Sequence, residues 1–401
     1  MNYASSDSFR WKNYVLFNNE TIHELWNSSY CRNGRKILYI LGAGFDVRMN
    51  TGVTALLERC PNIHITCMVV GAQATGGLSD NAHGAGTAQN LAELYGLLPA
   101  TSIIQRTIAL YAAEASYAER QYIGDKSSIT HIITGWPDIQ DYRDIYLDIS
   151  SLSRGVYISL AGKILSMLDS NSGPASRPNF FILATENAVI DALIKEEGLV
   201  GRPQFLQGFS LSFSAFENSK PLLWLPILGE HKQTHLENTY EELVSKTQKM
   251  EIFPVLPFPS RDPRRSDNLF EQHHQLLFDA LTIDFKDVIY VHEQNPYEAY
   301  LSLARTIVRF NQSMQLLGGC RVAISPFSSK LLSVGAMLLS YELHKFRPGV
   351  SALKDRAIEV GIITTISESY LAPARQELLA QHQHSEVFVT WVAGEPYAPL
   401  S

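Results

Sequence analysis

The chain has 401 residues, of which 45% are hydrophobic and 18% are charged, so it can bury the core of two domains and is not a disordered protein. Its net charge of −7 argues against bulk nucleic-acid binding through overall charge. Four cysteines without a C-x-x-C pair predict reduced thiols in a cytoplasmic protein, three of them in the core. Neither a secretory leader nor an apolar run of about 18 residues is found, so we expect no membrane segment.

Short apolar runs alternate with amphipathic stretches of helical length in the first half of the chain. We expect strands at 37–41, 63–70, 144–149 and 180–184, helices at 51–59, 91–98, 101–120, 157–168 and 188–197, and a flexible loop at 71–90. Strands joined by helices pair in parallel, and continuous apolar strands suit a sheet that is covered on both faces. The pattern therefore predicts a Rossmann-like layout.

The second half repeats this plan. Strands are expected at 222–228, 252–256, 288–292, 321–325 and 360–365, with a helix at 235–248 and further helices between the later strands. We expect an α/β protein with two Rossmann-like halves and mostly parallel sheets, divided into domains at 1–218 and 219–401.

Short motifs recur between the two halves. Ile40-Leu41-Gly42 returns as Ile227-Leu228-Gly229, and Ser153-Arg154 returns as Ser329-Lys330. An internal duplication explains the recurrence, and so does the spacing that any two α/β domains share.

Polar residues follow the predicted strands, and the carboxyl ends of strands are where open α/β sheets bind ligands. The candidates for ligand binding are Gly42, Gly44, Arg48, Ser150, Ser153, Arg154, Glu186, Arg261, Arg264, Arg265, Ser329 and Lys330, and the candidates for catalysis are Asp46, Asp148 and Glu293. Histidine pairs without suitable partners give no metal site. The sequence identifies no cofactor.

A glycine turn follows the first predicted strand. Gly42 and Gly44 allow a ligand to approach the backbone, but Val47 breaks the G-x-G-x-x-G pattern. A strand followed by G-x-G resembles the first motif of methyltransferases that use S-adenosylmethionine. Those enzymes usually end the second strand with an acid, whereas Val70 here leads into Gly71. The alternative is a tight turn that serves packing alone.

Residues 148–154 (DISSLSR) predict an anion-binding cradle. Asp148 ends a strand, Ser150 and Ser153 offer hydroxyls, and Arg154 opens a helix whose first amides can also donate to an anion. The plainer alternative is a helix-capping serine followed by an exposed cation.

This acid–hydroxyl–cation pattern resembles the strand-end motif of CRISPR-associated Rossmann-fold (CARF) domains, which bind cyclic oligonucleotides. The middle positions of that motif are commonly glycine, and here they are Ser151 and Leu152. The second half keeps the hydroxyl and the cation at Ser329 and Lys330 but lacks the acid. The resemblance implies nucleotide sensing and a role in prokaryotic antiviral defence.

The proline-rich segment 257–267 carries Arg261, Arg264 and Arg265 in a stiff loop, which suits phosphates or carboxylates. The alternative is a solvated loop in which Asp262 and Asp267 pair with these cations.

In the next predicted strand-to-helix turn, Glu293 could act as a general base or bind a ribose, and Asn295 is expected to cap the helix.

These features favour a nucleotide-binding sensor or processing protein, with an anionic ligand in a cleft between the halves. Arg154, Lys330 and the three arginines of 257–267 would hold that ligand. A protein partner or a homo-oligomer is also expected, because any downstream effect would need a partner or chemistry at the cleft. The first alternative is a transferase, either an S-adenosylmethionine methyltransferase or a two-domain glycosyltransferase. The second alternative is a catalytically silent scaffold subunit.

Overall fold

In the computed structural model, residues 9–27, 30–31, 34–73, 83–112, 121–171, 177–211, 213, 220–247, 249–344 and 358–397 are described. The chain forms two compact units. The first unit comprises Tyr14–Val200 and Ser367–Ser401, and the second comprises Met1–Asn13 and Gly201–Ile366. Most of the second unit is thus inserted between two segments of the first.

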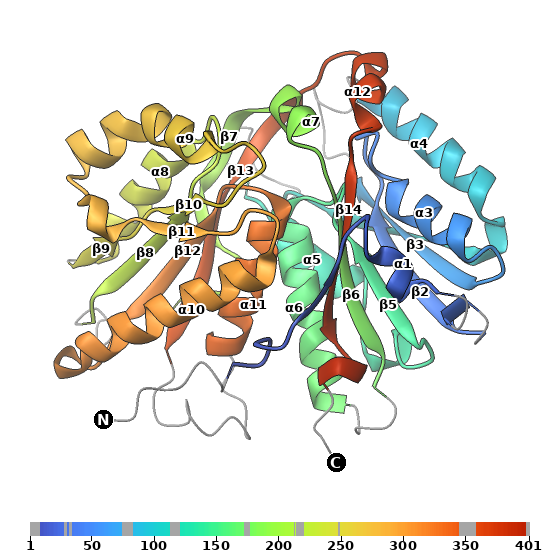
Figure 1. Cartoon of the computed structure of the whole chain (residues 1–401), viewed down its shortest axis with the longest axis horizontal. Coiled ribbons are helices and arrows are strands. Elements are labelled where there is room, and N and C mark those ends of the chain that lie inside the picture. Colours follow the sequence, from blue (N-terminus) through green and yellow to red (C-terminus); the bar gives the residue numbers. More distant parts are fainter. Residues whose placement is uncertain are drawn as a thin grey trace. The chain divides into compact units, whose positions relative to one another are not determined.

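The first unit is built on a seven-stranded sheet (Figure 1). Its strands, in spatial order, are β1 (Val15–Phe17), β14 (Glu386–Ala393), β6 (Asn179–Glu186), β5 (Asp144–Asp148), β2 (Lys36–Gly42), β3 (His64–Gln73) and β4 (Ile103–Ala109). The strands β2 to β6 are parallel, and β14 pairs antiparallel with both β6 and β1. Counted along the chain, the five parallel strands have the Rossmann order 3-2-1-4-5.

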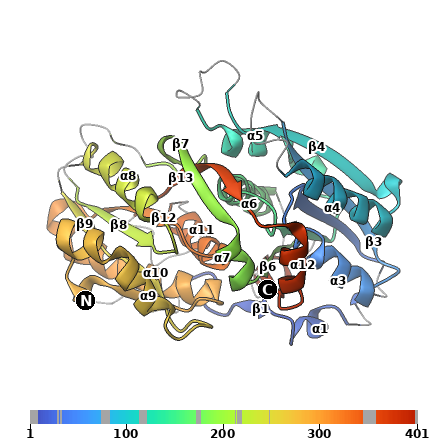
Figure 2. The ribbon, with the colours of Figure 1, turned by 90° about the horizontal axis from the view of Figure 1, so that it is seen from above.

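Helices cover both faces of this sheet. They are α1 (Ile22–Leu25), α3 (Thr51–Arg59), α4 (Gly84–Leu97), α5 (Gly124–His131), α6 (Arg154–Asn171), α7 (Ala188–Leu193) and α12 (Arg375–His382). Tyr39 of β2 shares one core with Leu56 of α3 and Leu94 of α4. Leu38 and Leu147, which face the opposite way, are fully buried too. Helices α5 and α6 lie next to each other (Figure 2).

The second unit repeats the strand order. Its sheet runs β11 (Ile289–Val291), β10 (Val255–Pro257), β8 (Leu222–Ile227), β12 (Arg321–Pro326), β13 (Glu359–Leu371) and β7 (Lys195–Phe205), and β9 (Met250–Ile252) pairs with β8. Strands β8 to β13 pair in parallel, again in the order 3-2-1-4-5. Trp224 of β8 packs with Leu236 and Leu269.

The helices of the second unit are α8 (Gln233–Val244), α9 (Arg265–His274), α10 (Pro296–Ser313) and α11 (Lys330–His344). The start of α10 follows from its sequence, because the Asn295 side chain accepts hydrogen bonds from the amides of Tyr297 and Glu298, and Pro296 occupies the first turn. The expected capping role of Asn295 is confirmed.

The predicted fold class is confirmed, since the protein is α/β with two mostly parallel sheets. Several element predictions are wrong. Strand β4 occupies part of the helix expected at 101–120, whose residues 113–120 lie outside the described part. Likewise β3 and α4 occupy much of the expected 71–90 loop, whose residues 74–82 are not described. The expected helix at 188–197 ends at Leu193, where β7 follows, and 252–256 splits into β9 and β10.

The division into units also differs from one break after residue 218, a position outside the described residues. The chain passes between the units after Asn13, Val200 and Ile366. The physical reason is β14, which pairs with β6 and so returns the end of the chain to the first sheet. Strand pairing between distant segments leaves no local mark in the sequence.

The recurring motifs fall on matching strands. Residues 40–42 end β2. Residues 227–229 begin at the last residue of β8, which has the corresponding central place in the other sheet. Ser153 and Ser329 each stand directly before the helix that follows the fourth strand. The halves therefore share one plan, which both a duplication and a common α/β layout explain.

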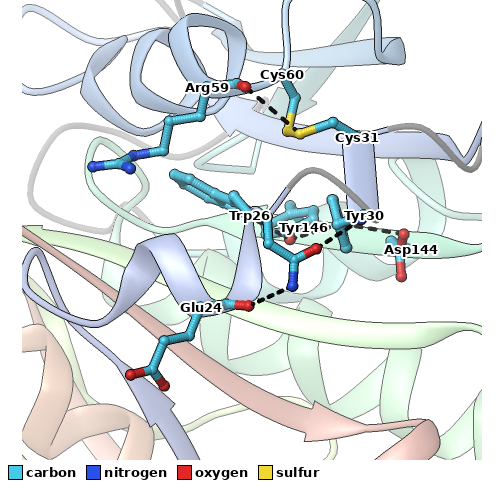
Figure 3. Close-up of a disulfide and its surroundings, with 9 residues drawn as sticks. Glu24, Trp26, Tyr30, Cys31, Arg59, Cys60, Asp144 and Tyr146 are labelled. Carbon is cyan, nitrogen blue, oxygen red and sulfur yellow. Dashed lines mark hydrogen bonds between the residues drawn. A yellow bond between two sulfur atoms is a disulfide. The ribbon is translucent and has the colours of Figure 1, made fainter.

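A disulfide joins Cys31 and Cys60 (Figure 3). The prediction of reduced thiols is therefore wrong for these two residues, because the chain around Cys31 packs beside the end of α3. Three buried cysteines were expected, and Cys60, Cys67 and Cys320 are buried. Burial raises the pKa of the Cys67 and Cys320 thiols to about 12.

Among the described helices, none is long and apolar enough to cross a membrane.

Candidate functional site

Strand order reverses between β2 and β5 in the first unit and between β8 and β12 in the second, and such points bind ligands in open sheets. The predicted site residues divide between the units. The first unit holds Gly42, Gly44, Asp46, Arg48, Asp148, Ser150, Ser153, Arg154 and Glu186, and the second holds Arg261, Arg264, Arg265, Glu293, Ser329 and Lys330. We describe each group within its own unit.

The glycine turn after β2 packs against the loop after β5. A Cβ on Gly42 would lie 2.7 Å from Leu152 Cδ2, and one on Gly44 would lie 3.2 Å from Ser151 Cβ. The Ser151 hydroxyl donates to the Gly42 carbonyl at 2.6 Å. In the second unit, a Cβ on Gly229 would collide with the Phe327 carbonyl oxygen. Close approach of two loops thus accounts for these glycines, in agreement with a turn that serves packing.

Arg48 is neutralised by two carboxylates. It is 3% exposed, its guanidinium donates to Asp46 at 2.7 Å, and it lies 2.8 Å from an Asp191 oxygen of α7. Burial alone would lower the pKa of Arg48, but Asp191 and Asp46, helped by Glu186 at the end of β6, raise it above its ordinary value. These contacts fasten the loop after β2 to α7.

The acid and hydroxyls of the predicted cradle bond to the strand ends. Asp148, 1% exposed, accepts from the Tyr39 hydroxyl at 2.6 Å and from the Ser150 amide at 2.9 Å. Ser150 Oγ in turn accepts from the Thr185 amide at 2.9 Å. Burial and the Asp148 carboxylate raise the pKa of Tyr39 well above its usual range. Asp148 and Ser150 thus contribute to the structure of the central strands, and their predicted ligand roles stay predictions.

Ser153 and Arg154, the remaining cradle residues, stand at the start of α6 beside tyrosines. We call Tyr111, Tyr122, Tyr157 and Tyr370 the tyrosine cluster. Ser153 lies close enough to the Tyr122 hydroxyl to influence its pKa, and the Tyr122 ring meets the Tyr111 ring edge-on at 6.2 Å. Small residues make this arrangement possible, because a Cβ on Gly155 of α6 would lie 2.5 Å from the Tyr122 hydroxyl.

The Tyr370 hydroxyl lies among charged and phenolic groups. Tyr370 as a whole is 40% exposed, but desolvation of its hydroxyl raises the pKa, Glu196 of β7 raises it further, and Arg154 lowers it, with a net value above the ordinary one. Tyr111 and Tyr157 are close enough to contribute as well. The pKa of Tyr122 is also raised, chiefly by burial. Tyr122 and Tyr370 are therefore protonated O–H donors at neutral pH, beside one guanidinium.

The sequence missed the tyrosine cluster because its members come from four separate segments. Tyr111 follows β4, Tyr122 precedes α5, Tyr157 lies on α6 and Tyr370 ends β13. Only Tyr157, one helical turn beyond Arg154, was within reach of a local pattern.

In the second unit, Arg265 links two acids. Its guanidinium donates to Glu230 at 2.7 and 2.8 Å and to Glu293, and Glu293 also accepts from the Arg261 amide at 2.8 Å. Burial tends to raise the pKa of Glu230, but the hydrogen bonds and charge of Arg265 bring it below its usual range. These contacts order the 258–265 loop. Catalysis by Glu293 stays a prediction.

Ser329 caps α11, since its hydroxyl accepts from the Leu332 amide at 3.3 Å, and Lys330 is the first residue of that helix. Arg261 and Arg264 are exposed in the loop before α9. Over the residues that the structure describes, no group of three or more histidine, cysteine or acidic side chains could hold a metal ion.

Fold and strand order define a protein of two Rossmann-like α/β units. No protein-family model matches the chain, and no curated protein matches it. Among solved structures, it is similar to a protein described as a universal stress protein from Pseudomonas aeruginosa UCBPP-PA14, with 8% identity, 88% of this chain and 98% of that chain covered, and a TM-score of 0.22.

A universal stress protein from Archaeoglobus fulgidus DSM 4304 shows 12% identity over 81% of this chain and 94% of that chain, with a TM-score of 0.21. A protein described as a UDP-N-acetylglucosamine 2-epimerase from Listeria monocytogenes shows 10% identity over 81% and 92%, with a TM-score of 0.20. Scores this low carry no argument about activity.

Proposed function

We propose that the protein is a nucleotide-binding sensor or processing protein whose first unit holds an anionic ligand at Arg154. The observation that carries the proposal is the gathering of the tyrosine cluster around the start of α6, where Ser153 and Arg154 stand. In this proposal, Arg154 and the first-turn amides of α6 meet a phosphate.

Tyrosines supply the two other contacts that a nucleotide needs. Their protonated hydroxyls donate to phosphate or sugar oxygens, and the ring of Tyr370, a residue that is 40% exposed, offers a face on which a base can stack. Glu196, near the Tyr370 hydroxyl, can accept from a ribose hydroxyl or a base N–H. The resemblance to CARF domains makes cyclic oligonucleotides the first ligands to test and antiviral defence the proposed setting.

The test is a thermal-shift and calorimetry panel on the full chain, with mononucleotides, dinucleotides, cyclic oligonucleotides, nucleotide sugars and S-adenosylmethionine. A ligand at about 100 times its Kd should add about 2.7 kcal/mol to the free energy of unfolding. Arg154→Ala should weaken binding by about 1.5–3 kcal/mol, the worth of a charged hydrogen bond. Tyr370→Phe should cost about 0.5–1.5 kcal/mol, since it removes only the hydroxyl.

Arg106→Ala is the matched control, because Arg106 is an exposed arginine on β4 of the same unit. Binding of a nucleotide that Arg154→Ala leaves unchanged would contradict the proposed site. A hit restricted to S-adenosylmethionine or a nucleotide sugar would favour the transferase. If none of the compounds in the panel binds, the result would favour the alternative of a catalytically silent scaffold subunit.

A further inference from the structure

Two aromatic side chains stand half exposed on the second unit, where β10 and β11 form one edge of the sheet (Figure 1). Phe258, directly after β10, is 52% exposed, and Tyr290 of β11 is 49% exposed. Their ring centroids lie 6.0 Å apart at an interplanar angle of 76°. Large aromatic rings normally gain by burial, so a paired and exposed set is typical of a binding surface.

The loop that carries Phe258 is held in place by the protein itself. The Phe258 amide donates to the Val291 carbonyl at 2.7 Å, which fixes it against β11. Farther along the loop, Glu293 accepts from the Arg261 amide and the Asp262 carboxylate accepts from the Arg264 amide at 2.9 Å. The loop backbone that carries Phe258 is therefore ordered before any ligand arrives, which lowers the entropy lost on binding.

Two exposed guanidiniums belong to the same loop. Arg261 and Arg264 are both exposed, and within the described ranges the Arg264 side chain forms no ion pair. Arg265 forms ion pairs with the neighbouring acids Glu230 and Glu293. Aromatic faces beside guanidiniums are the elements that recognise unstacked bases and their phosphates.

We propose that Phe258, Tyr290, Arg261 and Arg264 form a second binding site, which takes a short stretch of single-stranded nucleic acid. One base stacks on the aromatic pair, and the flanking phosphates contact the two guanidiniums. The edge strand β11 has only three residues, too few to add a peptide strand, so this surface suits a nucleic acid better than an extended peptide.

Overall charge limits the strength of this site without excluding it. The chain carries a net charge of −7, so the proposal assigns the attraction to the local arginines Arg261 and Arg264. Two neutralised phosphates on a single strand correspond to a slope of about −1.4 in a plot of log Kobs against log salt concentration. Binding should therefore be modest and depend only weakly on salt.

The experiment is fluorescence anisotropy of a labelled single-stranded hexanucleotide with the full chain, at about 50 mM salt and upward. Phe258→Ala and Tyr290→Ala should each weaken binding about 5- to 150-fold, the range for loss of one stacked base. Tyr290→Phe should retain it, since the ring is kept. Changing both Arg261 and Arg264 to alanine should bring the salt slope close to zero.

Matched control variants show whether the oligonucleotide binds at this surface. Arg305→Ala removes an exposed arginine of α10 and should leave binding unchanged. Arg154→Ala separates the two proposals: if it abolishes hexanucleotide binding while Phe258→Ala and Tyr290→Ala bind like wild type, the oligonucleotide occupies the first unit and the second site is overturned. The proposal is overturned by absence of oligonucleotide binding, by Phe258→Ala and Tyr290→Ala binding like wild type, or by a charge-matched acidic peptide binding as tightly. Circular dichroism checks that each variant is folded.

Discussion

Replacing Arg48 tests whether this residue stabilises the fold or binds a ligand. Methionine at this position keeps most of the side-chain volume and removes the guanidinium. The exposed fractions of the Arg48 and Asp46 side chains are 4% and 12%, so the Asp46 carboxylate would lose its partner in a buried setting. Breaking such a pair from one side costs about 3–5 kcal/mol.

Two details place the expected cost near the lower end of that range. The Asp191 side chain is 48% exposed, so its pair with Arg48 adds little, about 0–1 kcal/mol. Asp46 also accepts from the Arg48 backbone amide at 2.9 Å, a bond that any side chain leaves intact. We therefore expect Arg48→Met to destabilise the first unit by about 3 kcal/mol, which lowers its Tm by about 6–12 °C.

Differential scanning calorimetry of the full chain measures this, and a double-mutant cycle identifies the cause. Asp46→Asn should destabilise the wild type but cost much less in the Arg48→Met background, because the pair is already broken. If Arg48→Met unfolds within about 0.5 kcal/mol of wild type, the ion-pair argument fails. If it keeps its stability and loses ligand binding, Arg48 is a ligand-binding residue, as its place after the first strand predicts.

Three further predictions concern the disulfide, the close-packed glycines and pH. Cys31→Ser, which opens the bridge to Cys60 across 29 positions, should cost about 3.6 kcal/mol by the chain-entropy relation, and reductant should lower the Tm of wild type but not of this variant. Gly229→Ala should destabilise the protein by about 1–3 kcal/mol, because the added Cβ would meet the Phe327 backbone. Gly96→Ala in α4, where the space around the glycine is open, should stabilise the protein by about 0.5–1 kcal/mol. Equal Cm values for the two variants in urea would contradict the packing argument. Burial lowers the pKa of His273, so below the ordinary histidine pKa of about 6.5 the unfolded chain binds more protons than the folded chain. The free energy of unfolding should therefore fall on acidification through that value. His273→Gln should lose less stability than wild type between about pH 7 and pH 5, and an identical loss would refute this.

Local patterns predicted the central strands well, because parallel strands buried on both faces appear as continuous apolar runs. Strand β4 lacks such a run, since Gln105, Arg106 and Thr107 are exposed at the sheet edge, and this is why its segment was predicted to be helical. Strand β14 was not among the predicted strands, and its partner β6 is about two hundred residues away along the chain.

The candidate site was only partly visible for the same reason. The motif at 148–154 located Ser153 and Arg154 at the start of α6. What the motif could not show was that Asp148 bonds to Tyr39 on a neighbouring strand, or that Tyr370 approaches from the far end of the chain. Spacing along a sequence records neighbours within one turn or strand and omits those that the sheet brings together.

The place of β14 between β1 and β6 sets an order of events during synthesis on the ribosome. β1 has β14 as its partner and emerges from the ribosome long before it. The five parallel strands of the first sheet are complete by Glu186, yet one edge must wait while the segment Gly201–Ile366 of the second unit is made. The second unit can close once Ile366 is released, whereas the first unit still waits for β14 and is completed later.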